Sequence, residues 1–388
     1  MLQNSKSLAQ QAKDALKPAL EGQLSPAETI ALYNQFLKVE EQRILKQHRS
    51  GAGGLEIAAE RALLIDTVLA TILQAAINTR KQSGNFPIAL VATGGYGRQL
   101  LNPRSDIDLL FLLPRSSTKL SQPQQDLVQG VLYLLWDVGF KVGYACRSIA
   151  ECIQQAAADP ENKTALMDAR LIAGDEDLFK QFQARFAKEC IQKGQTSFFE
   201  QRRKDLSTRH EKYSRTVFLQ EPNVKEGCGG MRDYHAIQWI SRVKTGSAKL
   251  EDLVEKKILT ASAFKETEEA YDFLHRVRNE LHYHSGKATD QLTLLLQGVV
   301  ATAFNYPQRD ILRSTEAFMR DYYRHTRHLY QHATSLMEYF QIEQDTRADS
   351  GIRSFLTFRK KKREEFDGFV ARDGRLFPTS QEIFNADP

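Results

Sequence analysis

Apolar residues recur with the period of an α-helix along two segments near the start of the chain. The first is predicted over 26–48, with Ser25 as its N-cap and Glu28 completing a capping box. A glycine-rich stretch at 50–54 interrupts the pattern, and a second helix is predicted over 55–81. The N-terminal region is therefore expected to be helical.

Short apolar runs replace this pattern beyond residue 86. Residues 87–93, 106–113 and 140–147 are each too short for a typical helix, and their composition favours buried strands. Helical patterns at 124–138 and 149–157 alternate with these runs, and the segment 164–173 is expected to be another strand. This alternation indicates an α/β or α+β domain over roughly 55–185.

The pattern beyond about residue 195 is almost entirely helical. A basic amphipathic stretch at 197–216 precedes a glycine-containing loop at 221–230. Further helices are predicted at 231–244, 262–284, 289–303 and 309–342, followed by a polar linker at 343–353. In the tail, Asp373-Gly374 is typical of a hairpin turn, and the basic run 359–363 is typical of a solvated linker.

Composition limits the classes of protein that need consideration. The 388 residues include 41 % hydrophobic and 26 % charged residues, which excludes a collagen-like or wholly disordered chain. A net charge of +5 is compatible with nucleotide binding but does not indicate a DNA-coating protein. The four scattered cysteines, the missing signal-peptide pattern and the short apolar runs predict a cytoplasmic protein with reduced thiols.

The segment 94–108 carries the strongest chemical signal. Asp106 and Asp108 alternate with Ile107, so in a strand they point to the same face. Two neighbouring carboxylates repel each other unless a cation lies between them, and such hard oxygen ligands suit Mg²⁺ together with substrate phosphates. The preceding Gly94-Gly95 turn allows backbone N–H groups to approach a triphosphate closely.

Neither part of this motif is informative alone. An isolated Asp-x-Asp is often a surface strand end, and an isolated Gly-Gly is usually only a turn. Their combination between two apolar strands favours a metal and nucleotide site. Arg98 provides either a donor to phosphate or a structural contact.

The motif GGYGRQLLNPRSDIDLL resembles the nucleotidyltransferase superfamily that includes DNA polymerase β, and within it the PII uridylyltransferases. Three further segments are similar to that family: LLWDVGFKVGYACRSIAEC at 134–152, TALMDARLIAGDEDLF at 164–179 and EPNVKEGCGGMRD at 221–233. The helix FMRDYYRHTRHLY at 318–330 is also similar. The resemblance covers about residues 25–388.

The resemblance implies an α+β fold, a small mixed sheet with flanking helices joined to a mostly helical domain. It divides the chain into an N-terminal helical extension at 1–54, a nucleotidyltransferase domain at 55–190, a helical domain at 191–345 and a linker with the start of a further region at 346–388. It also implies an HD hydrolase domain and two ACT domains in full-length members. No His-Asp dipeptide occurs here, so we expect transferase chemistry alone, in a shortened form of the protein.

The implied reaction is transfer of UMP from UTP to a tyrosine of the PII protein, with two Mg²⁺ ions and release of pyrophosphate. Asp106 and Asp108 are the implied metal ligands, and Asp168 is the candidate third carboxylate or general base. Asp168 could equally be a strand-end aspartate paired with Arg170. No membrane, DNA or RNA partner is expected.

The phosphate path is expected to be lined by Gly94, Gly95 and Ser105. Lys225 and Arg232 either bind phosphate or belong to a glycine-rich connection between domains. The chain departs from the family pattern at three positions, where the family usually has Glu, His and Pro: Leu100, Tyr144 and Cys228.

Two other functions remain open at this point. One is nucleotidyl transfer with another nucleotide or target, such as adenylylation. The other is a non-catalytic nucleotide-binding regulator, suggested by Leu100. A histidine row at 325, 328 and 332 has metal-ligand spacing, but a solvated or interface row is the favoured interpretation.

Overall fold

The computed structural model describes residues 2–78, 87–116, 118, 120–306 and 310–352, and three short strands at 365–366, 369–372 and 375–378. The chain divides into two compact units, 1–339 and 340–388, and each is described by itself. All sites discussed below lie in the first unit.

The first unit opens with helices that pack around a long hydrophobic helix. They are α1 (Leu2–Ala15), α2 (Lys17–Leu20), α3 (Pro26–Arg49) and α4 (Gly54–Asn78). The predicted capping box is confirmed: the Glu28 N–H donates to Ser25 Oγ at 3.4 Å, and the Ser25 N–H donates to Glu28 Oε2 at 2.9 Å. The last predicted residues of the second helix, 79–81, lie outside the described residues.

A four-stranded mixed sheet forms the centre of the nucleotide-binding half. Its strands are β1 (Ala89–Ala92), β2 (Ile107–Leu113), β3 (Val142–Ser148) and β4 (Arg170–Gly174). Their order is β3-β2-β1-β4; β2 and β3 are parallel, whereas β1 is antiparallel to both of its neighbours. Mixed pairing with helices on both faces confirms the predicted α+β class.

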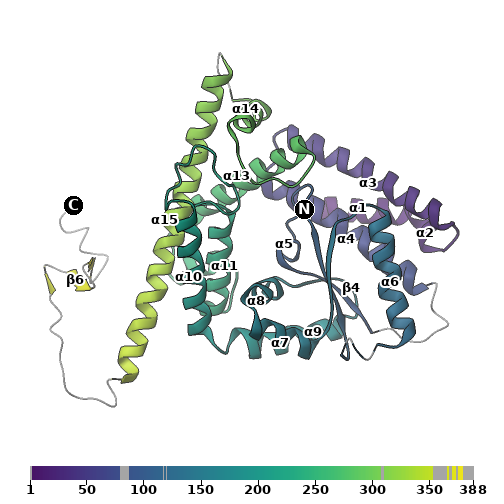
Figure 1. Cartoon of the computed structure of the whole chain (residues 1–388), viewed down its shortest axis with the longest axis horizontal. Coiled ribbons are helices and arrows are strands. Elements are labelled where there is room, and N and C mark those ends of the chain that lie inside the picture. Colours follow the sequence, from purple (N-terminus) through teal and green to yellow (C-terminus); the bar gives the residue numbers. More distant parts are fainter. Residues whose placement is uncertain are drawn as a thin grey trace. The chain divides into compact units, whose positions relative to one another are not determined.

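Alternation along the strands divides the hydrophobic core between the two faces of the sheet. Leu90, Leu109 and Phe111 pack with α4 and with α6 (Gln122–Asp137). Val91 and Leu110 pack on the opposite face with α7 (Ile149–Ala158) and α9 (Glu176–Phe186). Figure 1 shows α6 on one side of the strands and α7 and α9 on another.

The segment 164–173 is only partly a strand. Residues up to Met167 form the helix α8 (Pro160–Met167), whose N-cap Asp159 accepts a hydrogen bond from the Glu161 N–H. Asp168 is the C-cap of this helix, and β4 starts only at Arg170. The prediction that Asp168 and Arg170 share one strand face is therefore wrong, because a proline and an N-capping aspartate start a helix just upstream.

The second half of the first unit is helical, as predicted. A π-helical turn (Ala187–Ile191) ends α9 and leads to α10 (Gln195–Lys212), α11 (Met231–Thr245), α12 (Glu251–Glu255), α13 (Ala261–Ser285), α14 (Leu294–Ala303) and α15 (Ile311–Ile352). Thr293 caps α14, so this helix starts later than the predicted residue 289. The last helix continues through most of the predicted linker at 343–353.

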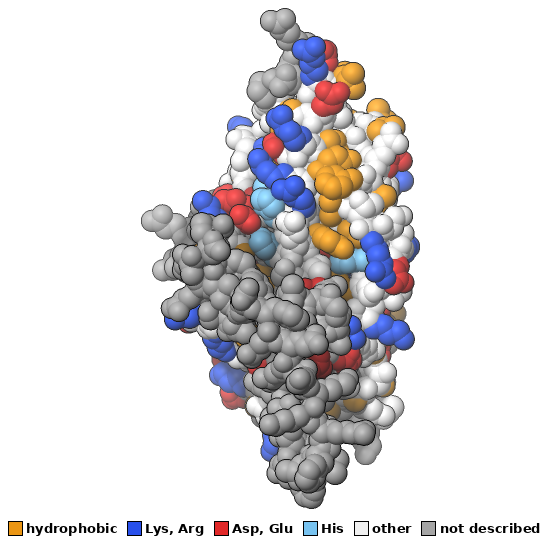
Figure 2. Space-filling view, turned by 90° about the vertical axis from the view of Figure 1, so that its left-hand side faces the viewer, with side chains coloured by type: hydrophobic (Ala, Val, Ile, Leu, Met, Phe, Trp, Pro, Cys, Tyr) orange, Lys and Arg blue, Asp and Glu red, His pale blue; other side chains and the backbone are white. Residues whose placement is uncertain are grey.

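Exposed hydrophobic side chains gather on one face of the molecule (Figure 2). Helix α14 and the start of α15 carry Leu294, Leu295, Ile311 and Leu312, each more than half exposed. None of the described helices is long and apolar enough to cross a membrane.

In the second unit, β5 (Glu365–Phe366), β6 (Phe369–Arg372) and β7 (Arg375–Pro378) form an antiparallel sheet. Strands β6 and β7 flank the predicted Asp373-Gly374 turn, whose two residues lie outside the described part, as does the basic run 359–363.

Candidate active site

The two predicted carboxylates lie beside the glycine turn. The turn forms a single helical turn, α5 (Gly94–Gly97), and Gly94 adopts a φ of +57°. A Cβ placed on Gly94 would lie 3.4 Å from Asp108 Oδ2, and the Thr93 N–H donates to the Asp108 carbonyl oxygen at 3.0 Å. Asp106 immediately precedes β2, and Asp108 is its second residue. The structure therefore brings together the turn and the two acidic side chains.

The electrostatics of Asp108 follow from this crowding. Partial burial of its carboxylate and the negative charge of Asp106 raise the pKa of Asp108, while the charge of Lys225 lowers it. Within the described part of the chain, neither carboxylate accepts a hydrogen bond or forms a direct ion pair. Two unsatisfied, mutually repelling carboxylates form a donor set suited to a divalent cation.

The donor set of Asp106 and Asp108 offers two carboxylates to a cation. No group of three His, Cys, Asp or Glu side chains among the described residues could hold a metal ion. Mg²⁺ commonly binds through one or two protein carboxylates and fills its other positions with water and substrate phosphates. Asp106 and Asp108 fit that mode of binding.

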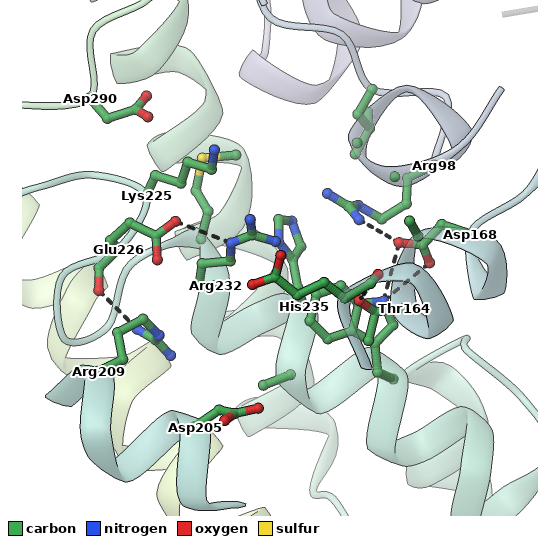
Figure 3. Close-up of a pocket in the computed structure, with 18 of the residues that line it drawn as sticks. Arg98, Thr164, Asp168, Asp205, Arg209, Lys225, Glu226, Arg232, His235 and Asp290 are labelled. Carbon is green, nitrogen blue, oxygen red and sulfur yellow. Dashed lines mark hydrogen bonds and ion pairs between the residues drawn. The ribbon is translucent and has the colours of Figure 1, made fainter. Parts of the chain in front are cut away.

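A cavity of about 1090 Å³ extends from the carboxylates towards the helical half. Figure 3 shows three of its cationic lining side chains on neighbouring elements: Arg209, Lys225 and Arg232. The cationic residues that line the cavity are Arg98, Arg202, Lys204, Arg209, Lys212, Lys225, Arg232 and Arg278 of α13. Burial and the neighbouring arginines lower the pKa of Lys225. The Lys225 ammonium has no hydrogen-bond acceptor among the described residues, so it is available to an anion.

The loop that carries Lys225 is held by its own backbone. Asn223 Oδ1 accepts hydrogen bonds from the N–H groups of Lys225 at 3.1 Å and Glu226 at 2.7 Å. The Arg232 N–H donates to the Lys225 carbonyl oxygen, and its side chain donates to Glu226 Oε1 at 3.2 Å (Figure 3). The loop therefore connects two helices and presents cations to the cavity, and phosphate binding by Lys225 and Arg232 stays a prediction.

Asp233, in the first turn of α11, holds this loop in place through hydrogen bonds. Its fully buried carboxylate accepts hydrogen bonds from the Arg209 guanidinium, from His210 at 3.0 Å and from the Gly229 N–H at 2.8 Å. Arg209 also donates to the carbonyl oxygens of Glu226 and Gly227. The position of Lys225 thus depends on a buried charge network.

Asp168 lies in the same cavity but is fully engaged by protein groups. Arg98 donates to Asp168 Oδ2 at 2.5 Å (Figure 3), and Trp239 Nε1 donates to the same oxygen at 3.1 Å. The alternative pairing with Arg170 is wrong, because Arg170 makes a two-pronged contact with Asp66 of α4. Asp168 joins no three-carboxylate group in the described structure, so its role as a third metal ligand stays a prediction.

Two further predicted residues face the cavity. The Ser105 hydroxyl is buried and lacks a hydrogen-bond partner among the described residues, so it can serve a ligand. A Cβ on Gly95 would lie 3.7 Å from the Arg98 guanidinium, which places this glycine over the Arg98–Asp168 pair.

A buried polar network behind the site has no signature in the sequence. The Asn102 amide donates to Asn279 Oδ1 at 2.7 Å and contacts His275, and its carbonyl oxygen accepts from Arg278 at 2.6 Å. Arg278 also donates to Asp290 Oδ1 at 2.6 Å. Through these hydrogen bonds, Asn102 holds the segment that precedes Ser105 against α13. An Asn-Pro step in a loop gives no sign of partners more than 170 residues away.

Comparison with known proteins identifies the family. Residues 197–337 match the model described as GlnD PII-uridylyltransferase, and residues 74–172 match the nucleotidyltransferase domain. A bifunctional uridylyltransferase/uridylyl-removing enzyme of Bradyrhizobium diazoefficiens is 31 % identical over 385 residues, covering 97 % of this chain. The chain belongs to the PII-uridylyltransferase family.

Other relatives in this family agree. An enzyme of the same name from Caulobacter vibrioides strain NA1000 is 33 % identical over 345 residues, covering 87 % of this chain. The chain spans 40 % of the length of the Bradyrhizobium relative and 36 % of the Caulobacter relative. The predicted domain boundaries at 54, 190 and 345 stay predictions.

The three departures from the family pattern have distinct environments. Leu100 lines the main cavity, beside the glycine turn. Tyr144 is 51 % exposed on β3 and packs against Trp136. Cys228 is buried, and its thiol donates to the His210 carbonyl oxygen; burial raises its pKa to about 11. All four cysteines are free thiols.

The histidine row on α15 is an interface feature. His332 contacts Glu266 of α13 at 2.8 Å, and His328 lies 3.9 Å from the same carboxylate. His325 stacks on Phe273 at 4.5 Å, and burial lowers its pKa to about 4. These contacts with α13 agree with the interpretation of the row as an interface feature.

A thermal-stability measurement tests the metal assignment. We expect Asp108→Asn to raise the unfolding midpoint by roughly 1–3 °C without divalent ions, because it relieves repulsion with Asp106. Mg²⁺ should then raise the midpoint of the wild-type protein but not that of the variant. Asp177→Asn, at an exposed aspartate on α9, should respond to Mg²⁺ like the wild type. Equal responses of all three proteins would contradict the assignment.

Proposed function

We propose that this chain transfers UMP from UTP to a tyrosine of a PII-type signalling protein and releases pyrophosphate. The observation that carries the proposal is the juxtaposition of Asp106, Asp108 and Gly94 opposite Lys225, whose ammonium has no acceptor in the described part of the chain. The family membership supports the choice of UTP and PII, since the relatives are named for uridylyl transfer.

Different residues of the chain bind the nucleotide and the metal. Lys225 and Arg232 bind the triphosphate charge, and Ser105 and the backbone of Gly94 and Gly95 donate hydrogen bonds to it. Asp106 and Asp108 hold divalent cations. Two bound Mg²⁺ ions would supply activation of the attacking hydroxyl and neutralisation of the charge on the leaving group.

The transfer itself is a displacement at the α-phosphorus. The tyrosine oxygen forms a bond to that phosphorus, and the bond to the oxygen bridging the α- and β-phosphates breaks. Pyrophosphate carries away the electron pair, and the hydroxyl proton leaves to solvent. Arg98 stays paired with Asp168, and this ion pair forms part of the cavity wall.

A labelling experiment tests this proposal. The chain is incubated with α-phosphate-labelled UTP, Mg²⁺, 2-oxoglutarate and a cognate PII protein, and we expect label on one PII tyrosine. A PII variant with that tyrosine replaced by phenylalanine is the control. No label on wild-type PII would overturn the assignment of the acceptor.

A second candidate is kept because Leu100 lines the cavity where the family usually has Glu. This change favours a different nucleotide, or binding without transfer. A thermal-shift comparison of the common nucleoside triphosphates with Mg²⁺ separates these cases. We expect the largest stabilisation with UTP, and a larger shift with ATP would favour adenylylation.

A further inference from the structure

A second, smaller cavity of about 430 Å³ meets the main cavity at the two carboxylates. Among the described residues, only Asp106 and Asp108 line both cavities. The other residues that line the smaller cavity are Trp136, Phe140, Lys141, Val142 and Gly143. The two carboxylates therefore lie at the junction of the two cavities.

The two spaces differ in chemistry. The main cavity contains Lys225, Arg232 and Arg278 and is suited to a polyanion. The smaller one has aromatic walls from Trp136 and Phe140, with one cation, Lys141. A triphosphate belongs in the first, and an aromatic side chain belongs in the second.

Exposed aromatic rings continue from this cavity onto the surface. We call Tyr133, Trp136 and Tyr144 the aromatic patch; they are 58 %, 43 % and 51 % exposed. Trp136 packs edge-on against Tyr133 at 5.8 Å and against Tyr144 at 6.2 Å. Clustered exposed aromatic residues are typical of protein-binding surfaces.

The strand that carries Tyr144 is also suited to an extended partner. β3 is at the edge of the sheet, and its outer side pairs with no other described strand. Opposite Asp108, this strand has Gly143, where a Cβ would lie 2.8 Å from Asp108 Oδ1. The glycine thus keeps the passage between cavity and carboxylates open.

We propose that the smaller cavity receives the acceptor tyrosine and that the aromatic patch binds the loop carrying it. This inference rests on the proposed function and adds the place of the protein substrate. In-line displacement requires the attacking oxygen and the leaving pyrophosphate on opposite sides of the α-phosphorus. With the triphosphate among the cations, the acceptor enters from the aromatic side, and both meet at Asp106 and Asp108.

Steady-state kinetics of Trp136→Ala test the proposal, with acceptor and UTP varied separately. We expect kcat/KM for the PII acceptor to fall about tenfold, because an aromatic contact is lost. The KM for UTP should change by less than about twofold, because the triphosphate site is intact. Trp136→Phe should retain most of the wild-type kcat/KM for the PII acceptor. Phe218→Ala, at another exposed aromatic residue, is the matched control and should behave like the wild type.

Two outcomes would overturn the inference. One is a rise in the KM for UTP in Trp136→Ala, which would put the nucleobase in this cavity. The other is a kcat/KM for the PII acceptor that is unchanged in Trp136→Ala. The thermal unfolding midpoint of Trp136→Ala provides a check on folding and should stay close to that of the wild type, because the Trp136 side chain is 43 % exposed.

A fluorescence measurement tests the tyrosine cavity without using PII, so that its result does not depend on the choice of PII as acceptor. If wild-type protein labels no PII, the proposed function fails, and N-acetyl-tyrosinamide is then used as the probe. Its binding with Mg²⁺ and UTP present should change the emission of the wild-type protein, whose two tryptophans include Trp136. Trp136→Phe should show no change. A wild-type protein with no saturable response would refute the tyrosine cavity.

Discussion

Replacing Asp106 or Asp108 by Asn is expected to lower the rate of UMP transfer by about a thousandfold or more. Each carboxylate lies at the junction of both cavities, and an amide cannot hold a divalent cation as a carboxylate does. The rate is measured with labelled UTP and PII at saturating substrate.

The control for this loss is Asp177→Asn, which removes a charge from an exposed helix surface and should leave the rate unchanged. The double variant at positions 106 and 108 should be no slower than the worse single variant, because residues that act as a unit are not additive. Transfer within tenfold of wild type in both single variants would contradict the role in transfer assigned to the two carboxylates.

Replacing Asp233 by Ala is expected to lower the free energy of unfolding by about 3–5 kcal/mol. The substitution leaves Arg209 and His210 without their buried partner, and breaking such a pair is strongly destabilising. Because the same network holds the Lys225 loop, the KM for UTP should rise as well. Urea unfolding and transfer kinetics at neutral pH check the two effects.

Asp177→Ala is the matched control, since its partner Lys180 is exposed and the pair should contribute little. A loss of stability in Asp233→Ala no larger than in this control would contradict the role assigned to the buried network. An unchanged KM for UTP would show that Lys225 is positioned independently of Asp233.

The pH dependence of stability provides another test of Asp233. Burial alone would raise its pKa, but the hydrogen bond from His210 and the charge of Arg209 hold the pKa below its usual value. Its stabilising contribution is full above the unfolded pKa of about 3.9 and is lost as the pH falls through the lower folded value. In Asp233→Ala, stability should fall less steeply in this acid range. Parallel pH profiles would contradict the assignment.

The sequence by itself determined the local features of this protein. Ser25 and Glu28 start a helix through contacts three residues apart, so the capping box was readable directly. The alternation around Ile107 placed Asp106 and Asp108 together, because side-chain direction in a strand follows from position alone. The resemblance added the family and the α+β class, both confirmed.

Only the tertiary structure decided which distant groups meet. Asp168 pairs with Arg98 rather than with Arg170, because α8 ends at Met167 and turns the carboxylate towards α5 and α11. Trp136 lines one cavity with the two carboxylates because β3 pairs in parallel with β2 after α6. Such contacts depend on how helices and strands pack, and pairwise packing across many residues has no periodic signature in the sequence.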